Sequence, residues 1–358
     1  MELLITIANS DNWKVIDGIA TFLSLCIIIY GGNKLFHWWN SIKFFYSNSP
    51  CFNSNTIIVI GLCDKNRIYI DSELALGSNL IIVEQNKENL YINEYMKSSN
   101  VSVLIANPKE QETLMKLNLD AKKYIVVSTG KDVDNIEIVS QILTINKNVN
   151  IYVQIENRSL RYFHKENGLL QGSNIKIYSY YEDASRELFK KYDIDGKNYE
   201  ILSRNEEYSI VILGNTNLSY EVIFQACIMG QLPNENKLTI YCLDKNPKKF
   251  QKKVELNYTE IHNVPNIELK YIKFDIDSKL SYIKDFWYGR NLTNIFVCYE
   301  DEETNLGIAA NLSNITYLKE IERKELKTNI ILAIFNEYNI SNCIKSNKKS
   351  WIYGKNKR

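Results

Sequence analysis

The sequence has few histidines, little net charge and no patterned cysteines. Its three histidines, His37, His164 and His262, are far apart, which leaves little material for a histidine-based catalytic or metal cluster. Lys and Arg (43) nearly balance Asp and Glu (42), so no overall positive field would attract nucleic acid. We therefore expect neither a histidine metal centre nor a nucleic-acid partner.

The cysteines are scattered along the chain and form no C-x-x-C pair. Several lie inside apolar segments, where cysteine behaves as a small buried hydrophobe. This spacing argues against a zinc site and against a disulfide framework. It is typical of a protein in a reducing cytosol.

What the sequence does contain is one three-part pattern, present twice. An apolar run ends in glycine, a second apolar run ends in an acid, and a later run leads into an acid-x-x-Asn turn. The copies are of domain size, and a length of 358 residues suits two domains. Each begins as a right-handed βαβ unit.

We predict an α/β protein with two Rossmann-like, doubly wound parallel-sheet domains in tandem. The marks are Gly61, Glu84 and 132–135 in the first copy, and Gly214, Asp244 and 302–305 in the second.

Each glycine turn keeps only the first glycine of the dinucleotide fingerprint G-x-G-x-x-G. In the first copy, Cys63 and Asn66 occupy the second and third places. A Cβ at the second place obstructs a pyrophosphate, and one at the third loosens helix packing on the strand. In compensation, Lys65 and Arg67 can supply cations, and Glu84 can accept ribose hydroxyls. The alternative is an ordinary tight turn with a solvated acid.

Two further motifs follow in the first copy. The third apolar run ends in Ala106-Asn107, and the fourth leads into Thr129-x-x-Asp132-x-x-Asn135. Over residues 55–160 this order resembles the RCK or TrkA N-terminal (TrkA-N) domain, the nucleotide-sensing module of potassium channels and transporters, where Gly-Asp replaces Ala-Asn. Asn107 could still contact an adenine edge. Asp132 or Asn135 would first of all cap the next helix, expected over 136–143.

The resemblance implies a nucleotide ligand, with NAD(H) or an adenine nucleotide as candidates. No Tyr-x-x-x-Lys and no His/Asp pair stands beside either glycine turn, so we assign no catalytic residue. The candidate cofactor-binding residues are Gly61, Leu62, Cys63, Lys65, Arg67, Glu84, Asn107, Thr129, Asp132 and Asn135 in the first copy and Gly214, Asp244 and Asn305 in the second.

The segment 15–32 is apolar except for Asp17 near its start, and it predicts a single-pass transmembrane helix. Lys34 and Lys43 follow it without acids, which places the C-terminal bulk in the cytoplasm. A basic n-region typical of a signal peptide is missing. The alternative is a buried or interfacial helix. Tryptophans flank the segment as in an aromatic belt: Trp13, Trp38 and Trp39.

The repeat and the apolar segment together predict the domain limits. The connector between the copies resembles the crossover by which two RCK-type lobes pack together. We expect an anchor and juxtamembrane segment over 1–50, a first domain over 53–170, a connector over 171–205, a second domain over 206–345 and a basic tail over 346–358.

The chain thus resembles bacterial membrane-anchored proteins with two TrkA-N domains. This resemblance implies a non-enzymatic regulator in the cytoplasmic membrane that binds a nucleotide-like small molecule, self-associates and acts on a potassium channel or transporter partner. Any pore would belong to that partner, since the sequence has no selectivity filter. The alternatives are a signal-gated membrane effector in stress or phage defence, a ligand-free scaffold, and an NAD-dependent oxidoreductase.

Overall fold

The computed structural model divides into two compact units, residues 1–153 with 172–176 and residues 154–171 with 177–358. The predicted membrane segment 15–32 lies mostly outside the described residues. Among those that are described, no helix combines the length and the apolar character needed to cross a bilayer. The structure describes residues 21–24, 31–32, 34–45, 56–119, 124–167, 170, 174–194, 207–231, 237–275, 292–323, 328–333 and 351–353.

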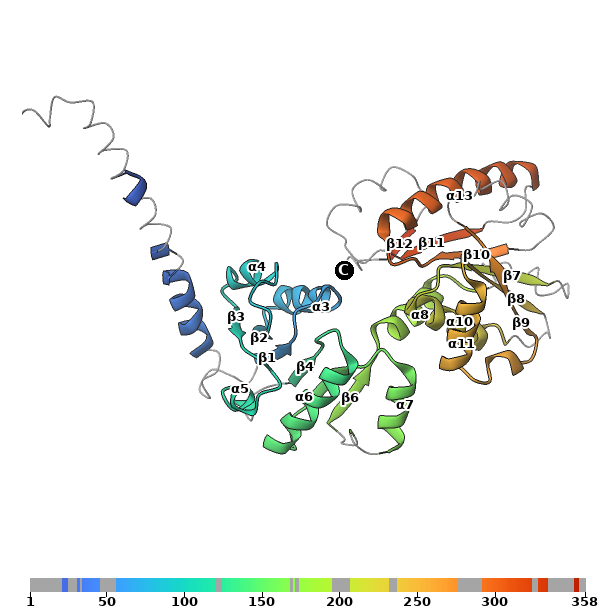
Figure 1. Ribbon diagram of the computed structural model, residues 1–358. Helices are drawn as coiled ribbons and strands as arrows, with labels where there is room; N and C mark the ends of the chain where they lie inside the picture. The colour runs from blue at the N-terminus through green and yellow to red at the C-terminus, as the bar shows by residue number, and fades with distance from the viewer. Residues whose placement is uncertain are drawn as a thin grey trace, which may run out of the picture. The chain divides into compact units, whose positions relative to one another are not determined.

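The first sheet has the strand order β3-β2-β1-β4-β5-β6 (Figure 1). Strands β1 to β5 pair in parallel along this order. The order reverses between β1 and β4, which is the topological switch point where open α/β sheets bind ligands. The strands are β1 (Thr56–Ile60), β2 (Asn79–Glu84), β3 (Val101–Ile105), β4 (Tyr124–Val127), β5 (Ile151–Gln154) and β6 (Ile175–Tyr178), and the helices between them are α3 (Asp64–Ala75), α4 (Ile92–Met96), α5 (Gln111–Met115) and α6 (Asp132–Ile145).

The second sheet repeats this topology with the order β12-β11-β10-β7-β8-β9, again with parallel pairs. Strands β7 to β12 take the places of β1 to β6, which confirms the duplication predicted from the sequence. They are β7 (Tyr208–Leu213), β8 (Leu238–Asp244), β9 (Ile267–Lys273), β10 (Leu292–Val297), β11 (Asn329–Ala333) and β12 (Trp351–Tyr353), and the helices of this unit include α7 (Arg158–Glu166), α8 (Tyr180–Lys191), α10 (Asn217–Met229), α11 (Pro247–Asn257) and α13 (Glu302–Arg323).

The strands of the second sheet are apolar at successive positions rather than alternate ones, as expected where both faces of a sheet are covered. Ile210 and Ile212 of β7 lie in the core formed with α8, α10 and α11. Val211 and Leu213 point to the opposite face and pack with Leu312 of α13. Figure 1 shows α13 on one side of this sheet and α8 and α10 on the other.

Two features of the second unit differ from the sequence prediction. Residues 351–353, expected in a basic tail, form β12 and pair with β11. Helices α7 and α8 belong to the compact unit of the second sheet, although α7 follows a strand of the first. Phe189 of α8 accounts for part of this, since it is buried and packs on Phe296 of β10. The limits expected at 170 and 205 stay a prediction.

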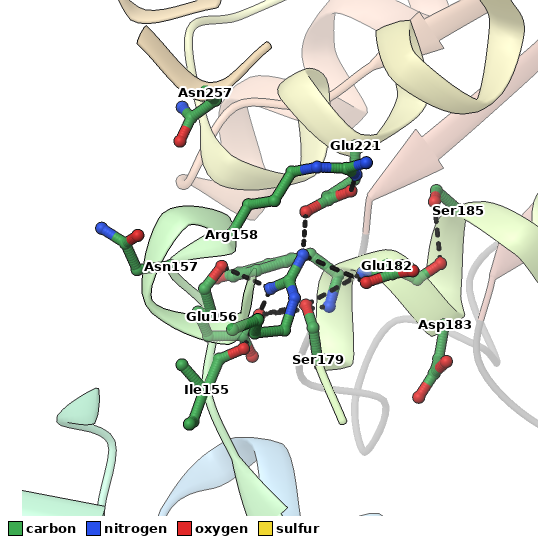
Figure 2. Close-up of polar contacts among 12 residues, drawn as sticks. Ile155, Glu156, Asn157, Arg158, Ser179, Glu182, Asp183, Ser185, Glu221 and Asn257 are labelled. Atoms are coloured by element: carbon green, nitrogen blue, oxygen red, sulfur yellow. Dashed lines mark hydrogen bonds and ion pairs between the residues drawn. The ribbon is translucent and has the colours of Figure 1, made fainter. Parts of the chain in front are cut away.

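A buried ion-pair network ties α7, α8 and α10 together (Figure 2). Nη2 of Arg161 lies 2.8 Å from Glu221 and 3.1 Å from Glu182, and its Nη1 donates to the carbonyls of Ile155 and Glu156 at 2.9 and 2.6 Å. Arg158 stacks over Phe224, 3.7 Å from the ring centroid. A buried charge costs several kcal/mol to leave unpaired, so these partners must stay together.

We expect Glu221→Ala to destabilise this unit by about 3–5 kcal/mol, because Arg161 would lose one of its two carboxylates in a buried site. Hydrogen exchange of the α7 and α10 amides would measure the change. Glu187→Ala is the matched control, since it removes a carboxylate from an exposed pair with Lys190 and should cost about 1 kcal/mol or less. Equal losses in the two variants would contradict the buried network.

A helical segment before the first sheet, residues 34–45, attaches to the edge strand β3. The buried Asn40 pairs with Val103 in the manner of a neighbouring strand: its Nδ2 donates to the carbonyl at 2.7 Å and its Oδ1 accepts from the N–H at 3.0 Å. Nζ of Lys43 donates to the carbonyls of Met96 and Ser98 at the end of α4. Burial lowers the pKa of Lys43. The helix thus satisfies polar groups that an edge strand leaves open.

Asn40→Ala should leave the Val103 N–H and carbonyl without these partners, at a cost of about 1–3 kcal/mol. We expect faster hydrogen exchange at Val103 while the amides of β1 remain protected. Ser41→Ala, one position along on the exposed side, is the control and should exchange as the unchanged protein does. The same exchange rate at Val103 in both variants would contradict the docking of helix 34–45 on β3.

Candidate functional site

The candidate site lies at the carboxyl end of β1, where the chain turns through Gly61 into α3. Gly61 has a φ of +91°, and a Cβ there would lie 2.4 Å from the carbonyl oxygen of Ser128. Gly214 repeats this after β7, with a φ of +99° and Cys298 backbone atoms 3.0 Å from a Cβ. Both predicted glycines are therefore required by conformation and by space.

Polar side chains stand where the third glycine of each fingerprint is missing. Asn66 is buried, and its Nδ2 donates to the Gly61 carbonyl at 2.7 Å while its Oδ1 accepts from the Cys63 N–H. Ser219 does the same in the second sheet, donating to the Gly214 carbonyl at 2.6 Å. In each copy, the side chain that replaces the third glycine therefore braces the turn through a hydrogen bond to the carbonyl of the first glycine.

The side chains at the second glycine position turn toward the neighbouring strand. The Cys63 thiol lies 3.7 Å from the Ser128 carbonyl after β4. In the second sheet, Thr216 makes the same contact as a shorter hydrogen bond, 2.8 Å to the Cys298 carbonyl after β10. Each side chain thus links the glycine turn to the strand across the switch point.

Glu84 lies at the tip of β2 as predicted, and backbone groups hold its carboxylate in place. Its Oε2 accepts from the Leu62 N–H at 2.8 Å, and its Oε1 accepts from the Asn86 N–H at 2.7 Å. Asn89 donates to the Leu62 carbonyl, so the loop is fixed from both sides. Asn89 Nδ2 also lies 3.4 Å from Oε2 of Glu84. A carboxylate has about four acceptor positions, so one is left for a ligand's hydroxyl group.

Asp244 occupies the matching tip of β8, but with fewer contacts. Its Oδ1 accepts from the Asn246 N–H at 2.8 Å. Asn215 occupies the position in the second domain that corresponds to Leu62, and its Oδ1 accepts a hydrogen bond from the Tyr220 hydroxyl. Burial, followed by the negative charges of Asp244 and Glu300, raises the pKa of Tyr220 to about 12. Asp244 and Glu300 thus place negative charge close to the Tyr220 hydroxyl.

Asn135 and Asn305 hold the loops after β4 and β10. Oδ1 of the buried Asn135 accepts from the Thr129 N–H at 2.8 Å and from its hydroxyl at 2.7 Å. Asn305, also buried, accepts from the Tyr299 N–H and donates to the carbonyls of Tyr299 and Ala333. The helix-capping role expected of Asp132 or Asn135 is wrong, since α6 runs from Asp132 to Ile145 after the N-cap Lys131, and both residues lie inside the helix. As the fourth residue of α6, Asn135 instead holds the loop between β4 and α6 through Thr129.

The predicted cations divide between two places. Lys65 is partly exposed in the first turn of α3, beside the candidate site. Arg67 instead extends along α4: its Cζ lies 3.9 Å over the Tyr91 ring and its Nη2 lies 3.3 Å from Glu94. The Tyr91 hydroxyl donates to Asp64, which raises the pKa of that tyrosine. Arg67 therefore stabilises the segment that begins α4 and does not extend toward the glycine turn.

The remaining predicted residues lie at the ends of β3 and β4. Asn107 follows β3, where its Oδ1 accepts from the Lys109 N–H and its Nδ2 donates to Glu110. Lys109 in turn pairs with Asp134 of α6 at 2.6 Å, which joins this loop to the next helix. Asp132 is the first residue of α6 and is partly exposed. In the described residues, no cluster of His, Cys, Asp and Glu could hold a metal ion.

The geometry defines two Rossmann-like domains, each with a glycine turn and an acid at its switch point. Residues 57–170 match the family model of the TrkA-N domain, which confirms the resemblance inferred from the sequence. No curated protein matched the chain.

Solved structures of the protein GsuK share the fold over most of the chain. A GsuK mutant is 16% identical with a TM-score of 0.53, covering 90% of this chain and 74% of that one. "GsuK bound to ADP" is 15% identical with a TM-score of 0.52 and the same coverage. "GsuK channel bound to NAD" is 13% identical with a TM-score of 0.53, covering 90% and 67%. These likenesses establish the fold.

Gly61→Ala and Gly130→Ala separate the cost of a positive φ from the cost of a steric contact. Gly130 also has a positive φ, +87°, but a Cβ there would meet no atom within 4 Å. We expect Gly130→Ala to cost about 1–2 kcal/mol for the backbone alone, and Gly61→Ala about 1–3 kcal/mol more for the contact with Ser128. Native-state hydrogen exchange of the β1 amides would measure both. Equal costs would contradict the close approach.

Proposed function

We propose that this chain is a non-enzymatic, membrane-attached regulator of potassium transport whose first domain binds a nucleotide. The nucleotide's phosphates would lie at the Gly61 turn and the first turn of α3, near Lys65, and its ribose would contact Glu84. Binding would favour one conformation of the chain, and a channel or transporter partner would respond to it. NAD(H) or an adenine nucleotide fits this chemistry.

The observation that carries the proposal is the fixed carboxylate of Glu84 beside the switch point of a TrkA-N domain. Its two backbone donors orient it before any ligand arrives, and preorganisation lowers the cost of binding. The GsuK structures bound to ADP and to NAD support a nucleotide as the ligand class. The first helical turn beside it adds N–H groups that favour phosphate.

The second domain, on this proposal, keeps the fold without binding a nucleotide. Thr216 and Ser219 use their hydroxyls inside the turn, and the Tyr220 hydroxyl engages Asn215. Asp244 and Glu300 add negative charge there. We therefore propose one nucleotide site per chain and a scaffold role for the second domain.

Thermal unfolding of the full chain with NAD+, NADH, ATP, ADP, AMP and cyclic nucleotides tests the ligand. A bound nucleotide at a hundredfold excess over its Kd should stabilise the protein by about 2.7 kcal/mol. Calorimetry should give one site per chain. Stabilisation by none of these compounds would refute the nucleotide proposal and leave both domains as scaffolds.

Glu84→Gln and Asp244→Asn then locate the site. Both remove one negative charge from the tip of a second strand with little change in size. Glu84→Gln should raise the Kd about tenfold or more, because a hydrogen bond to a charged acceptor contributes about 1.5–3 kcal/mol. Asp244→Asn should leave the Kd unchanged. The reverse outcome would place the ligand in the second domain.

A further inference from the structure

The helical segment 34–45 has two faces of different character. Its inner face carries Phe36, Asn40 and Lys43, spaced four and three residues apart. Phe36 packs against the core of the first sheet, and the other two make the hydrogen bonds to β3 and α4 described above. The first unit therefore fixes which side of this helix faces outward.

The outer face of the helix is apolar and aromatic. Positions 35, 38 and 39 follow the three- and four-residue spacing of one helix face. Isolated exposed hydrophobic residues are ordinary, but several large ones on one short helix mark an interaction surface. The exposed fractions are 65% for Leu35, 61% for Trp38, 56% for Trp39 and 73% for Phe45.

Charge indicates which surface suits this face. No Asp or Glu occurs between Asp17 and Asp64, whereas Lys34 lies exposed on the helix. A cytoplasmic leaflet is anionic, and basic residues close to it are attracted to it. Tryptophan rings, apolar with one N–H donor, prefer the boundary between lipid and water. A second copy of the chain would bring the same acid-free face and no opposite charge.

We propose that helix 34–45 lies in the plane of an anionic lipid surface, with Leu35, Trp38, Trp39 and Phe45 in the headgroup region. An amphipathic helix of this kind buries its apolar face about 5–10 Å into the interface. The inference deepens the membrane attachment in the proposed function, yet it does not require residues 15–32 to span the bilayer.

A consequence is that one helix contacts both the lipid and the nucleotide-binding domain. Asn40 and Lys43 join its inner face to β3 and to the end of α4. The candidate site residue Asn107 follows the end of β3 closely. The lipid surface would therefore hold the TrkA-N domain in one orientation through its edge strand.

Depth-dependent fluorescence quenching of the full chain in vesicles tests the proposal. Trp13→Phe, Trp287→Phe and Trp351→Phe leave Trp38 and Trp39 as the only emitters among the five tryptophans. Vesicles contain phosphatidylcholine with one of two brominated lipids, labelled near the headgroup or near the chain end, with or without phosphatidylglycerol. We expect quenching by the shallow label, little by the deep one, and stronger quenching with phosphatidylglycerol.

Co-sedimentation of the same samples separates this inference from membrane attachment by 15–32. Protein that sediments with vesicles but is not quenched would overturn the inference and leave the attachment standing. Quenching that is no stronger with the anionic lipid would overturn the assignment to an anionic surface. Quenching that persists after Ile27→Lys and Ile28→Lys would support the surface helix while removing 15–32 as the anchor.

A pair of variants provides the control. Leu35→Asn with Phe45→Asn keeps both reporting tryptophans and should abolish the shallow quenching. Tyr162→Asn with Phe163→Asn removes two comparably exposed aromatic residues from α7 and should leave it unchanged. Far-ultraviolet circular dichroism would confirm that both variants fold. Equal loss of quenching in the two pairs would overturn the assignment to helix 34–45.

Discussion

The rest of the structure depends on the close approach of each glycine turn to the strand across the switch point. Gly61 passes so near Ser128, and Gly214 so near Cys298, that a side chain at either position would collide with backbone. This approach sets the first strand beside the fourth, and the neighbouring loops are then held by Asn135 and by Asn305. In both sheets the strand order reverses at that pairing. A fingerprint reduced to one glycine can therefore keep its fold, because that glycine is the one that sterics require.

Those parts of the architecture that depend on periodicity could be predicted from the sequence. Strands buried on both faces appear as unbroken apolar runs, as in 57–60 and 210–213, and a glycine or an acid marks where each ends. The same pattern predicts strand tips at Glu84 and Asp244, and in the structure these acids are the last residues of β2 and β8. Because both copies carry the same marks, their topology could be predicted twice from one pattern. The strand-tip acids are thus the part of the candidate site that sequence locates well.

What could not be predicted are contacts between residues far apart in the chain. The roles of Asn66 and Ser219 depend on a carbonyl that only the folded turn presents to them. Likewise, the position of Arg67 beside the glycine turn suggests a phosphate contact, whereas Tyr91 before α4 and Glu94 within it hold its guanidinium. The strand at 351–353 is too short for its alternation to be recognised, and it becomes a strand by pairing with β11. Each of these depends on tertiary context rather than on local pattern.

The switch point between β1 and β4 lies in the middle of the first sheet, away from its edge strands β3 and β6. At one edge, β3 is hydrogen-bonded to Asn40 of helix 34–45. On the other side of the switch point, β4 is followed by β5, which leads into α7. A ligand can shift a conformational equilibrium only by its difference in affinity for the two states. Glu84 ends β2 and the loop with Thr129 follows β4, so these two groups belong to the two halves of the sheet. A nucleotide that binds both together would favour one relative placement of those halves.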